Sequence, residues 1–466
     1  MSRSLAAALR PSSAPPMDHD RPMVRARRFW SLLGAQALGS FADNALRAAA
    51  IVAIAAAYRT GVQPGGDFHA PGWLAAEAGT YVGLCFTVPI LLFSMISGQI
   101  ADRYDRHVII RATKVVEVIL MLIASVFFAL GNAYGLLAFL FLMGVQSSFL
   151  APTRAAMMPQ YFPGRELMRA NGYFHGGSLI AIVLGLGIGG ALIVLPNGRY
   201  LVSAVLVTAA LAGMIAAFRT PAAPSPGLAR VNWNVLSQAS AMYRDVWRMP
   251  GVFWPMIGVG WFWGIGAITL ANLENFVSAL GGVSGDFTAF QAIFAIGAGL
   301  GSVAGGLIAN RMRDPMRLSG IGVAGSIACA LAVVAVARVV AAGGGPTPVS
   351  LVLNPTPILW GLAGLIVATA AFNGFFVVPL LTAVQARAPG HERARVLGTA
   401  NMTNGGMATF MALLVPASRP LGFDPITLWV GVAGLQLGVL LFMLHRLRTH
   451  APEPVSGPGA RAAAFD

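Results

Sequence analysis

A polar stripe interrupts the first long apolar segment of the chain, between Gly34 and Ile54. The stripe consists of Gln36, Ser40, Asp43 and Arg47, with Asn44 beside Asp43. The spacing of four, three and four residues places the first set on one face of a helix. Because a charge inside a membrane is costly, such a face predicts a water-filled cavity that binds a polar ligand rather than contact with lipid.

Asp43 and Arg47 allow two interpretations. In the first, the carboxylate and the guanidinium form an ion pair one helical turn apart and only pack the helix. In the second, Asp43 binds the amine of a zwitterionic head group and Arg47 binds its phosphate, since the guanidinium fork can donate two parallel hydrogen bonds. We favour the second interpretation, with Gln36, Ser40 and Asn44 as further binding residues.

The composition indicates the environment in which this stripe lies. The chain has 466 residues, of which 56% are hydrophobic and only 10% are charged, and its mean hydropathy is +0.71. A soluble domain carries roughly 25% charged residues, so the sequence predicts a membrane protein. The two cysteines, Cys85 and Cys329, lie far apart in apolar segments and are expected to be unpaired core residues.

Apolar segments long enough to cross a bilayer recur along the whole chain. They predict an all-α fold of twelve transmembrane helices in two six-helix bundles around a central cavity. The expected spans are 29–57, 78–101, 108–130, 134–157, 168–194, 200–218, 252–279, 287–310, 318–341, 356–386, 395–417 and 424–444.

The distribution of positive charge predicts the orientation. Of the 31 Lys and Arg residues, 26 fall on the side of the two termini. The opposite side holds only Arg59, Arg199, Arg338 and Arg419. Since cytoplasmic loops are enriched in Lys and Arg, both termini are expected in the cytoplasm of a bacterial inner-membrane protein. Residues 1–28 are expected to be a disordered cytoplasmic tail, and residues 446–466 a second cytoplasmic tail.

The two halves of the chain repeat short motifs in the same order, which predicts a duplicated six-helix unit. The repeats are Phe29–Gly34 with Phe253–Gly258, Gly98–Arg106 with Gly306–Asp314, and Pro163–Glu166 with Pro389–Glu392. The expected bundles are 29–218 and 251–445, joined by a cytoplasmic linker, 219–250. Helical spacing of Leu236, Ala239, Tyr243 and Val246 predicts an amphipathic interfacial helix in this linker.

The loop "SGQIADRYDRH" after the second span resembles the loop signature of the major facilitator superfamily. The matching residues are Gly98, Asp102, Arg103 and Arg106, and the second half has an echo at Asn310 and Arg311. We interpret them as a gate, because a carboxylate beside arginines of the neighbouring half can hold the cytoplasmic side shut. The alternative is a solvated turn that only sets topology. Asp105 stands where the family usually has glycine.

Three further motifs resemble the bacterial lysophospholipid transporters, a branch of this superfamily. They are Asp43-Asn44; Lys114 and Glu117; and Pro152, Arg154 and Pro159 followed by Ala170, Asn171 and Gly172. The resemblance covers the first half well and is mostly architectural in the second. Two positions depart from the family pattern: Ala42 replaces the first asparagine of its Asn-Asp-Asn triplet, and His175 stands where an acid is often found.

Other polar or aromatic residues inside the predicted spans complete the expected cavity. They are Asn171 and His175; Trp261; Asn272, Glu274 and Asn275; and Asn401 and Asn404. Spans one, five, seven and eleven line the cavity in the superfamily, which is why the resemblance implies these positions. A pH-sensitive His175 and an acyl-chain path beside Trp261 are the less favoured interpretations of those two residues. Lys114 and Glu117 are expected to form an intramembrane structural pair.

The resemblance implies a carrier that moves lysophospholipid across the bacterial inner membrane to the cytoplasmic leaflet, where a cytoplasmic acyltransferase could act on it. One rival is a proton-coupled exporter of drugs or small metabolites, with Asp43, His175 or Glu274 as the coupling group. The other is a scaffold that transports nothing. No nucleophile–base arrangement and no Walker motif are evident, so we expect neither an enzyme nor an ATP-driven pump. No metal, cofactor or nucleic acid is expected to bind.

Overall fold

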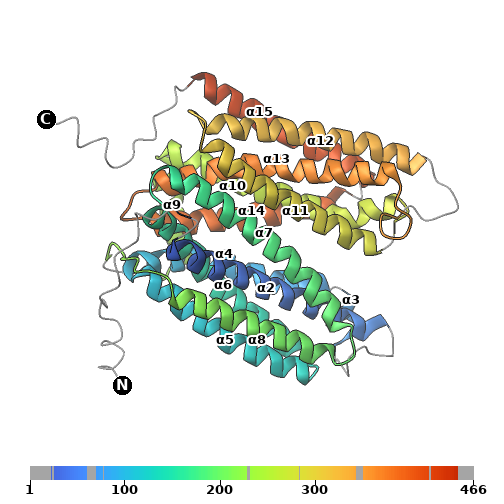
Figure 1. The fold of residues 1–466 in the computed structure, drawn as a ribbon, viewed down its shortest axis with the longest axis horizontal. Coiled ribbons are helices and arrows are strands. Elements are labelled where there is room, and N and C mark those ends of the chain that lie inside the picture. Colours follow the sequence, from blue (N-terminus) through green and yellow to red (C-terminus); the bar gives the residue numbers. More distant parts are fainter. Residues whose placement is uncertain are drawn as a thin grey trace. The chain divides into compact units, whose positions relative to one another are not determined.

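The computed structural model describes residue 23 and residues 26–59, 70–76, 78–227, 231–282, 284–342, 350–418 and 421–449. Within these ranges the regular secondary structure is helical (Figure 1). The helices are α2 (Arg27–Arg59), α3 (Gly72–Ala76), α4 (Ala78–Arg103), α5 (Arg106–Ala129), α6 (Ala133–Tyr161), α7 (Arg165–Ile193), α8 (Gly198–Phe218), α9 (Val235–Trp247), α10 (Pro250–Ala279), α11 (Ser284–Ala309), α12 (Met316–Ala342), α13 (Pro357–Arg387), α14 (Arg393–Ser418) and α15 (Thr427–Thr449).

The long helices coincide with the predicted spans, and the all-α membrane fold is confirmed. Eleven helices of the described chain are long and apolar enough to cross a membrane. The eleventh predicted span, 395–417, forms α14, which is as long as the other spans but less apolar than they are. Asn401, Thr403 and Asn404 give it that polarity. The predicted tails lie outside the described residues, apart from Met23, the start of α2 and the end of α15.

The contacts between residues divide the chain into two compact units. Unit 1 comprises Met1–Tyr161, Gly177–Gly264 and Ala383–Phe410, and unit 2 comprises Phe162–Gly176, Ile265–Thr382 and Met411–Asp466. The first boundary lies at the end of α6, and the other four fall inside helices, so α7, α10, α13 and α14 each contribute to both units. The division into bundles at 29–218 and 251–445 stays a prediction.

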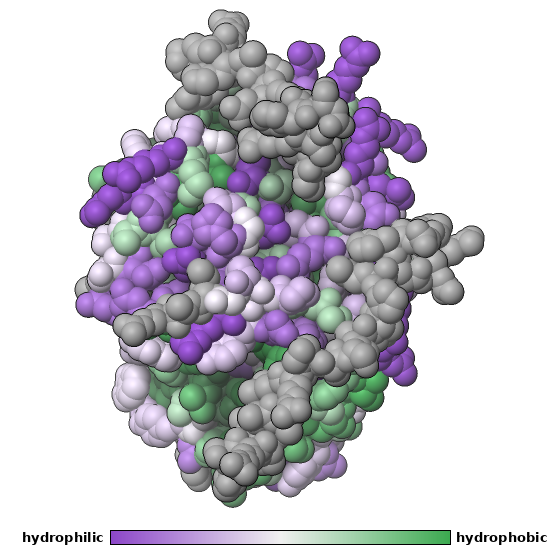
Figure 2. All heavy atoms as spheres, turned by 90° about the vertical axis from the view of Figure 1, so that its left-hand side faces the viewer, coloured by the Kyte–Doolittle hydropathy of each residue, from purple (hydrophilic) through white to green (hydrophobic). Residues whose placement is uncertain are grey.

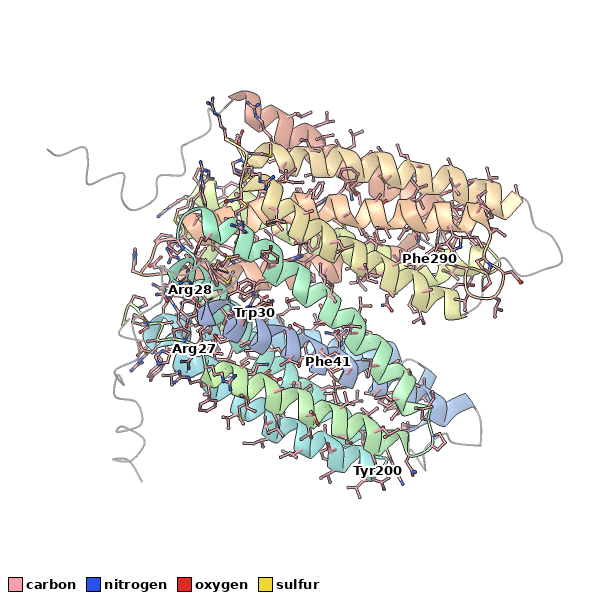
Figure 3. All side chains as sticks on the ribbon, in the orientation of Figure 1. Arg27, Arg28, Trp30, Phe41, Tyr200 and Phe290 are labelled. Carbon is pink, nitrogen blue, oxygen red and sulfur yellow. The ribbon has the colours of Figure 1, made fainter. Side chains whose placement is uncertain are left out.

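In unit 1, α4 packs against α6, α2 packs against α8, and α5 packs against both α6 and α8. One apolar core joins these helices, with Leu46, Met121, Phe139 and Leu206 among its fully buried members. Arg27 and Arg28 lie at one end of the unit, where α2 begins, and Tyr200 lies at the other end (Figure 3). The helices therefore run from end to end of the unit, as membrane spans must.

Helix α9 has the predicted amphipathic character, but its apolar face packs against protein rather than lying at a membrane surface. Ala239, Met242 and Val246 are buried in a core with residues of α4, α5, α6, α10, α13 and α14. Arg244 and Arg248 point outward, and hydrophilic side chains spread over this end of the molecule (Figure 2). The interfacial location of this helix stays a prediction. The side chain of Leu236 lies outside the described residues.

The first part of the linker, 219–227, is bound along the ends of α2, α5 and α6. Its carbonyl groups accept hydrogen bonds from side chains: Arg27 Nε to Arg219 O, Arg111 Nη2 to Thr220 O, Tyr161 OH to Pro221 O and Gln160 Nε2 to Pro224 O. Its Ser225 N–H donates to Asp105 Oδ1 at 3.0 Å. Asp105, the position where the family usually has glycine, therefore holds the linker.

In unit 2, α12 packs against α11 and α15. The buried Asp286 accepts hydrogen bonds from Ser350 Oγ and Val352 N, which ties the start of α11 to the segment before α13. Arg338 of α12 forms a 2.6 Å ion pair with Asp424, just before α15. Cys85 in unit 1 and Cys329 in unit 2 are both free thiols.

Candidate functional site

Asp43 is held by α6 rather than by its own helix. Ser147 Oγ donates a hydrogen bond to Asp43 Oδ2 at 3.0 Å. The other carboxylate oxygen, Oδ1, is buried and has no hydrogen-bond partner among the described residues. One oxygen of this carboxylate is thus fixed while the other keeps its capacity to accept.

Asp43 and Arg47 form no ion pair within 4 Å, although their spacing allowed one. Arg47 Nη1 instead donates to Asn44 Oδ1 at 3.3 Å, and its guanidinium lies 5.0 Å from the centre of the Phe86 ring. Arg47 Nε is buried and has no partner in the described part of the chain. Arg47 therefore keeps donors that a ligand can use.

The two remaining residues of the stripe differ in what they contact. Gln36 is buried, and its Nε2 donates to Ser178 Oγ of α7. The Ser40 carbonyl accepts from Asn44 Nδ2 at 2.8 Å. The stripe thus lies on α2 as predicted, with Gln36 joined to α7 and Asp43 joined to α6.

Lys114 and Glu117 form the expected buried pair, with Nζ 2.7 Å from Oε2 and side chains that are 0% and 1% exposed. Gln146 Nε2 donates to Glu117 Oε2 at 3.1 Å and to Thr113 O at 3.0 Å. Gln146 Oε1 lies 3.3 Å from Ser147 Oγ. A continuous network therefore runs from Lys114 on α5 through α6 to Asp43 on α2.

Helix α2 can approach Lys114 because residue 39 is glycine. A Cβ atom at Gly39 would lie 2.4 Å from Lys114 Nζ, which is closer than real Cβ contacts allow. A Cβ atom at Gly213 of α8 would lie 3.5 Å from the same nitrogen, which is an ordinary contact. The buried lysine thus occupies a space that Gly39 leaves open.

The motif residues Pro152, Arg154 and Pro159 all lie within α6. A helical proline leaves the carbonyl four residues earlier without its usual donor. For Pro152 this is Ser148 O, and Ser97 Oγ of α4 donates to it at 2.7 Å. Arg154 is half-buried seven residues after Ser147, so the two share a face of α6. No carboxylate of the described chain forms an ion pair with Arg154.

Asp102 binds both a neighbouring arginine and the start of α14. It is fully buried, and its Oδ1 accepts from Arg106 Nη2 and from Ala394 N, both at 3.0 Å. Its Oδ2 accepts from Arg395 N at 3.0 Å. The first N–H groups of a helix have no partner within the helix, so Asp102 acts as an N-terminal cap on α14.

Gly98 permits this contact because a Cβ atom there would lie 2.6 Å from Ala394 O. Burial lowers the pKa of Arg393, and nearby Arg106 lowers it further, while Asp102 opposes the shift. Arg103 does not join the cluster. Its side chain is exposed beside the Tyr104 ring, and its part in the gate stays a prediction.

Asn401 and Asn404 lie further along α14. Asn401 Nδ2 donates to Ser94 Oγ of α4 at 2.8 Å, whereas Asn404 Oδ1 is buried with no described partner. Trp261 on α10 is half-buried, and its Nε1 has no described acceptor. In unit 1, therefore, Asn404 and Trp261 keep polar atoms free, and Asn401 joins α14 to α4.

Asn171 and His175 lie in unit 2, one turn apart on α7. Asn171 Nδ2 donates to Thr382 Oγ1 at 2.9 Å, and His175 Nδ1 lies 3.0 Å from Ser302 Oγ. Ser302 Oγ also lies 2.7 Å from Ala298 O, to which it donates its single hydroxyl hydrogen. The imidazole must then donate from Nδ1, so His175 is held by α11.

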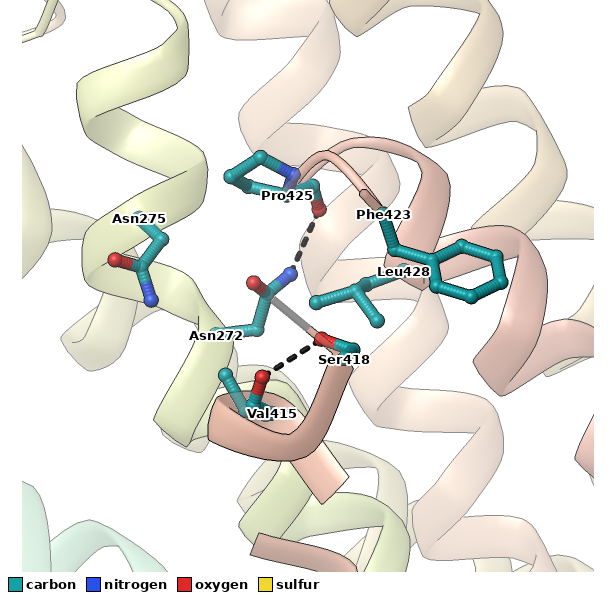
Figure 4. A pocket seen from close by; sticks show the side chains of 7 residues that line it. All are labelled: Asn272, Asn275, Val415, Ser418, Phe423, Pro425 and Leu428. Carbon is teal, nitrogen blue, oxygen red and sulfur yellow. Dashed lines mark hydrogen bonds between the residues drawn. The ribbon is translucent and has the colours of Figure 1, made fainter. Parts of the chain in front are cut away.

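A cavity of about 270 Å³ in unit 2 is lined by Asn272, Asn275, Val415, Ser418, Phe423, Pro425 and Leu428 (Figure 4). Asn272 Nδ2 donates to Pro425 O at 2.8 Å, while its buried Oδ1 has no described partner. The cavity thus offers one uncharged acceptor. The side chain of Glu274 lies outside the described residues.

The second-half repeat of the loop motif, at Asn310 and Arg311, does not form a comparable cluster among the described residues. Asn310 Oδ1 is buried without a described partner, and Arg311 is exposed. Asp314 pairs with Arg317 at 3.4 Å and accepts from Met316 N. The carboxylate that caps α14 in unit 1 therefore has no counterpart at Asn310.

Comparison with known proteins identifies the family to which these helices and this capped loop belong. The sequence model described as the Major Facilitator Superfamily matches residues 32–413. The chain belongs to the Major Facilitator Superfamily. It is therefore a multi-pass membrane protein of a transporter family.

Among curated members of the superfamily, the chain is similar to "Lysophospholipid transporter LplT" of Escherichia coli O1:K1 / APEC, with 24% identity over 429 residues. This match covers 90% of the chain and 94% of the relative. The protein of the same name from Citrobacter koseri is 24% identical over 428 residues. This match covers 90% of the chain and 95% of that relative.

Solved structures of the superfamily's fold are similar at low identity. A bacterial homologue of the iron transporter ferroportin, in an outward-facing state, gives a TM-score of 0.64 at 13% identity and covers 89% of this chain and 99% of that one. The human organic anion transporter MFSD10 gives a TM-score of 0.61 at 16% identity and covers 90% of this chain and 100% of that one. These likenesses show the fold.

Proposed function

We propose that this protein carries lysophospholipids across the bacterial inner membrane. The observation on which the proposal rests is that Asp43 and Arg47 form no ion pair with each other within 4 Å. Asp43 keeps an unpartnered carboxylate oxygen, and Arg47 keeps an unpartnered Nε, one turn apart on α2. A zwitterionic head group carries the two complementary charges, an ammonium and a phosphate. Two relatives that match almost the whole chain carry the name lysophospholipid transporter.

In this proposal the ammonium binds Asp43 and the phosphate binds Arg47. Arg154 supplies a second cation on α6, since it has no described carboxylate partner. We assign the other polar residues of unit 1 to the path of the head group: Gln36, Ser40, Asn44, Asn401 and Asn404. The acyl chain stays in contact with membrane lipid, because moving it into a polar cavity would cost about 0.8 kcal/mol per CH₂.

The Asp102 cluster serves as the cytoplasmic gate in this mechanism. Two N–H groups of α14 and the Arg106 guanidinium all converge on one buried carboxylate. Opening must break charge-assisted hydrogen bonds, so the cluster favours the closed state. Release on the cytoplasmic side, with both termini in the cytoplasm, would deliver the lipid to an acyltransferase that restores the second chain.

The test is uptake of labelled lysophosphatidylethanolamine by spheroplasts with and without the protein, alongside Asp43→Asn. We expect uptake that depends on the protein and falls at least tenfold in the variant, because the ammonium loses its ionic partner. If the inserted wild-type protein gives no uptake, the lipid assignment is wrong. A proton-coupled exporter of small molecules on the same fold is then the function to test.

A further inference from the structure

The network between Lys114 and Asp43 contains two residues that no sequence motif marked, Gln146 and Ser147. Both Nε2 hydrogens of Gln146 are used, one by Thr113 O and one by Glu117 Oε2. This fixes the amide, because its nitrogen must face α5 and its oxygen must face Ser147. The amide orientation on α6 is therefore set by the Lys114–Glu117 pair.

Ser147 passes this orientation on to Asp43. Its single hydroxyl hydrogen is shared between two acceptors, Asp43 Oδ2 at 3.0 Å and Gln146 Oε1 at 3.3 Å, in a three-centre hydrogen bond. The carboxylate is thus held by one oxygen, and Oδ1 is left open in a buried position. A held carboxylate with one open oxygen is ready to accept a donor from a ligand.

Among the described residues no cation is in contact with Asp43. Lys114 is 2.7 Å from Glu117, and its single positive charge is used there. Arg47, one turn along α2, attracts Asp43 but forms no ion pair with it within 4 Å. A buried carboxylate is stabilised by a cation that also donates hydrogen bonds to it. The open oxygen of Asp43 is the place where the ammonium of a ligand can do so.

We propose that Ser147 and Gln146 are positioning residues that hold Asp43 for the primary ammonium group of a ligand, with Lys114 and Glu117 as their anchor. Lys114 and Glu117 then have a part in ligand preference besides packing. This inference rests on the proposed function for the identity of the ligand, a lyso-lipid with an amine-bearing head group. It adds that Ser147 determines the preference for such a head group over one without an amine.

The first experiment compares kinetics of uptake for two lipids, lysophosphatidylethanolamine and lysophosphatidylglycerol, which lacks the amine. Ser147→Ala is expected to raise KM for the ethanolamine lipid about tenfold, as loss of a hydrogen bond to a charged group implies. Its KM for the glycerol lipid and its maximal rate for both should change less than about twofold. Ser147→Thr, which keeps the hydroxyl, should restore the wild-type KM.

The matched control is Ser148→Ala. Ser148 is the next residue on α6 and is fully buried, but its hydroxyl donates to Val145 O of its own helix. This variant should behave as wild type for both lipids. If Ser147→Ala affects both lipids equally, or neither, while the wild type transports them, Ser147 does not position Asp43 for an ammonium and the inference is wrong.

A second measurement needs no transport and separates this inference from the proposed function. Carbodiimides modify protonated carboxyl groups, and a hydrogen bond donated to the charged form disfavours protonation. At neutral pH, mass spectrometry should therefore find Asp43 modified several-fold faster in purified Ser147→Ala than in Ser148→Ala. Absence of lipid uptake by the wild type would overturn only the lipid assignment. Equal modification rates in the two variants would overturn the positioning of Asp43.

Discussion

The Asp102 carboxylate caps a helix almost three hundred residues further along the chain: Oδ2 accepts from Arg395 N at 3.0 Å. Oδ1 accepts at the same distance from Arg106 Nη2 and Ala394 N. One buried side chain thus satisfies two backbone groups and an arginine. Removal of the Asp102 carboxylate should have three consequences: α14 loses its cap, Arg106 loses its ionic partner, and the proposed gate is weakened.

Asp102→Ala should destabilise the closed cytoplasmic side. Loss of the cap costs about 1 kcal/mol, and the unpaired buried Arg106 adds about 3 kcal/mol. The rate of maleimide labelling of a cysteine introduced at Ser94, which contacts Asn401, should rise at least tenfold from the cytoplasmic side. Arg103→Ala is the control, since its exposed side chain lies outside the cluster. Unchanged labelling in Asp102→Ala would contradict the gate.

The Lys114–Glu117 pair should behave as a unit in unfolding measurements. Lys114→Met alone leaves Glu117 buried and unpaired, so we expect the free energy of unfolding to fall by about 3 to 5 kcal/mol. In the double variant Lys114→Met/Glu117→Leu, the free energy of unfolding should fall by clearly less than the sum of the losses in the two single variants. Thermal unfolding in detergent, followed by intrinsic fluorescence, provides the comparison. Additive losses would show that the two side chains do not interact.

Gly39→Ala tests the close approach of α2 to Lys114. The added methyl group would displace the ammonium, and overpacking of this kind costs about 1 to 3 kcal/mol. Gly187→Ala on α7 is the matched control, because nothing lies within 4 Å of its added Cβ. The melting temperature of the first variant should fall while that of the control stays unchanged. Equal melting temperatures would refute the predicted clash.

The linker contact should be visible in limited proteolysis. Asp105→Gly introduces the residue that the family usually has and removes the acceptor of Ser225 N–H. We combine it with Tyr161→Phe, which removes the donor to Pro221 O. Trypsin should then cut after Arg219 several-fold faster than in the wild type, because cleavage requires local release of the segment. Equal rates would mean that these two bonds do not hold the linker.

The Arg338–Asp424 pair predicts a pH dependence of stability. Burial acts to raise the pKa of Asp424, but hydrogen bonds from Thr427 and Arg338 outweigh it and lower the pKa below its ordinary value of 3.8. A lowered pKa contributes stability that is present above pH 3.8 and is lost as the pH falls through the folded-state pKa. The pair is well exposed, so the effect is small.

The corresponding measurement compares wild type and Asp424→Asn in thermal unfolding between neutral pH and about pH 3. The wild type should melt slightly higher at neutral pH, and the difference should vanish at the acid end. A difference that persists at low pH would show that the variant acts through something other than the carboxylate charge.

Much of the fold follows from the sequence because hydropathy reports directly on a membrane span. The polar stripe on α2 and the buried pair of Lys114 and Glu117 also follow, since each lies within one helix and depends only on helical spacing. Contacts between helices do not follow from helical spacing. Ser147 and Gln146 lie in an apolar helix outside the motif formed by Pro152, Arg154 and Pro159, and Asp43 is 104 positions away from Ser147.

Two further differences between the predictions and the structure also arise from contacts between helices. The amphipathic pattern of α9 specifies an apolar face, but only tertiary packing decides whether lipid or protein covers it; here Met242 and Val246 are covered by protein. The spacing of Asp43 and Arg47 permits an ion pair. Spacing within one helix cannot show that Ser147 of α6 binds Asp43 or that the Phe86 ring of α4 lies beside Arg47.

The most direct test of the central claim is uptake of labelled lysophosphatidylethanolamine into spheroplasts that contain wild-type protein, Asp43→Asn or no protein. The account predicts uptake in the first sample and near-background values in the other two, with the variant inserted at wild-type levels. Uptake that is equal in wild type and Asp43→Asn would contradict the role of this carboxylate. Background uptake in all three would contradict the lipid as the substrate.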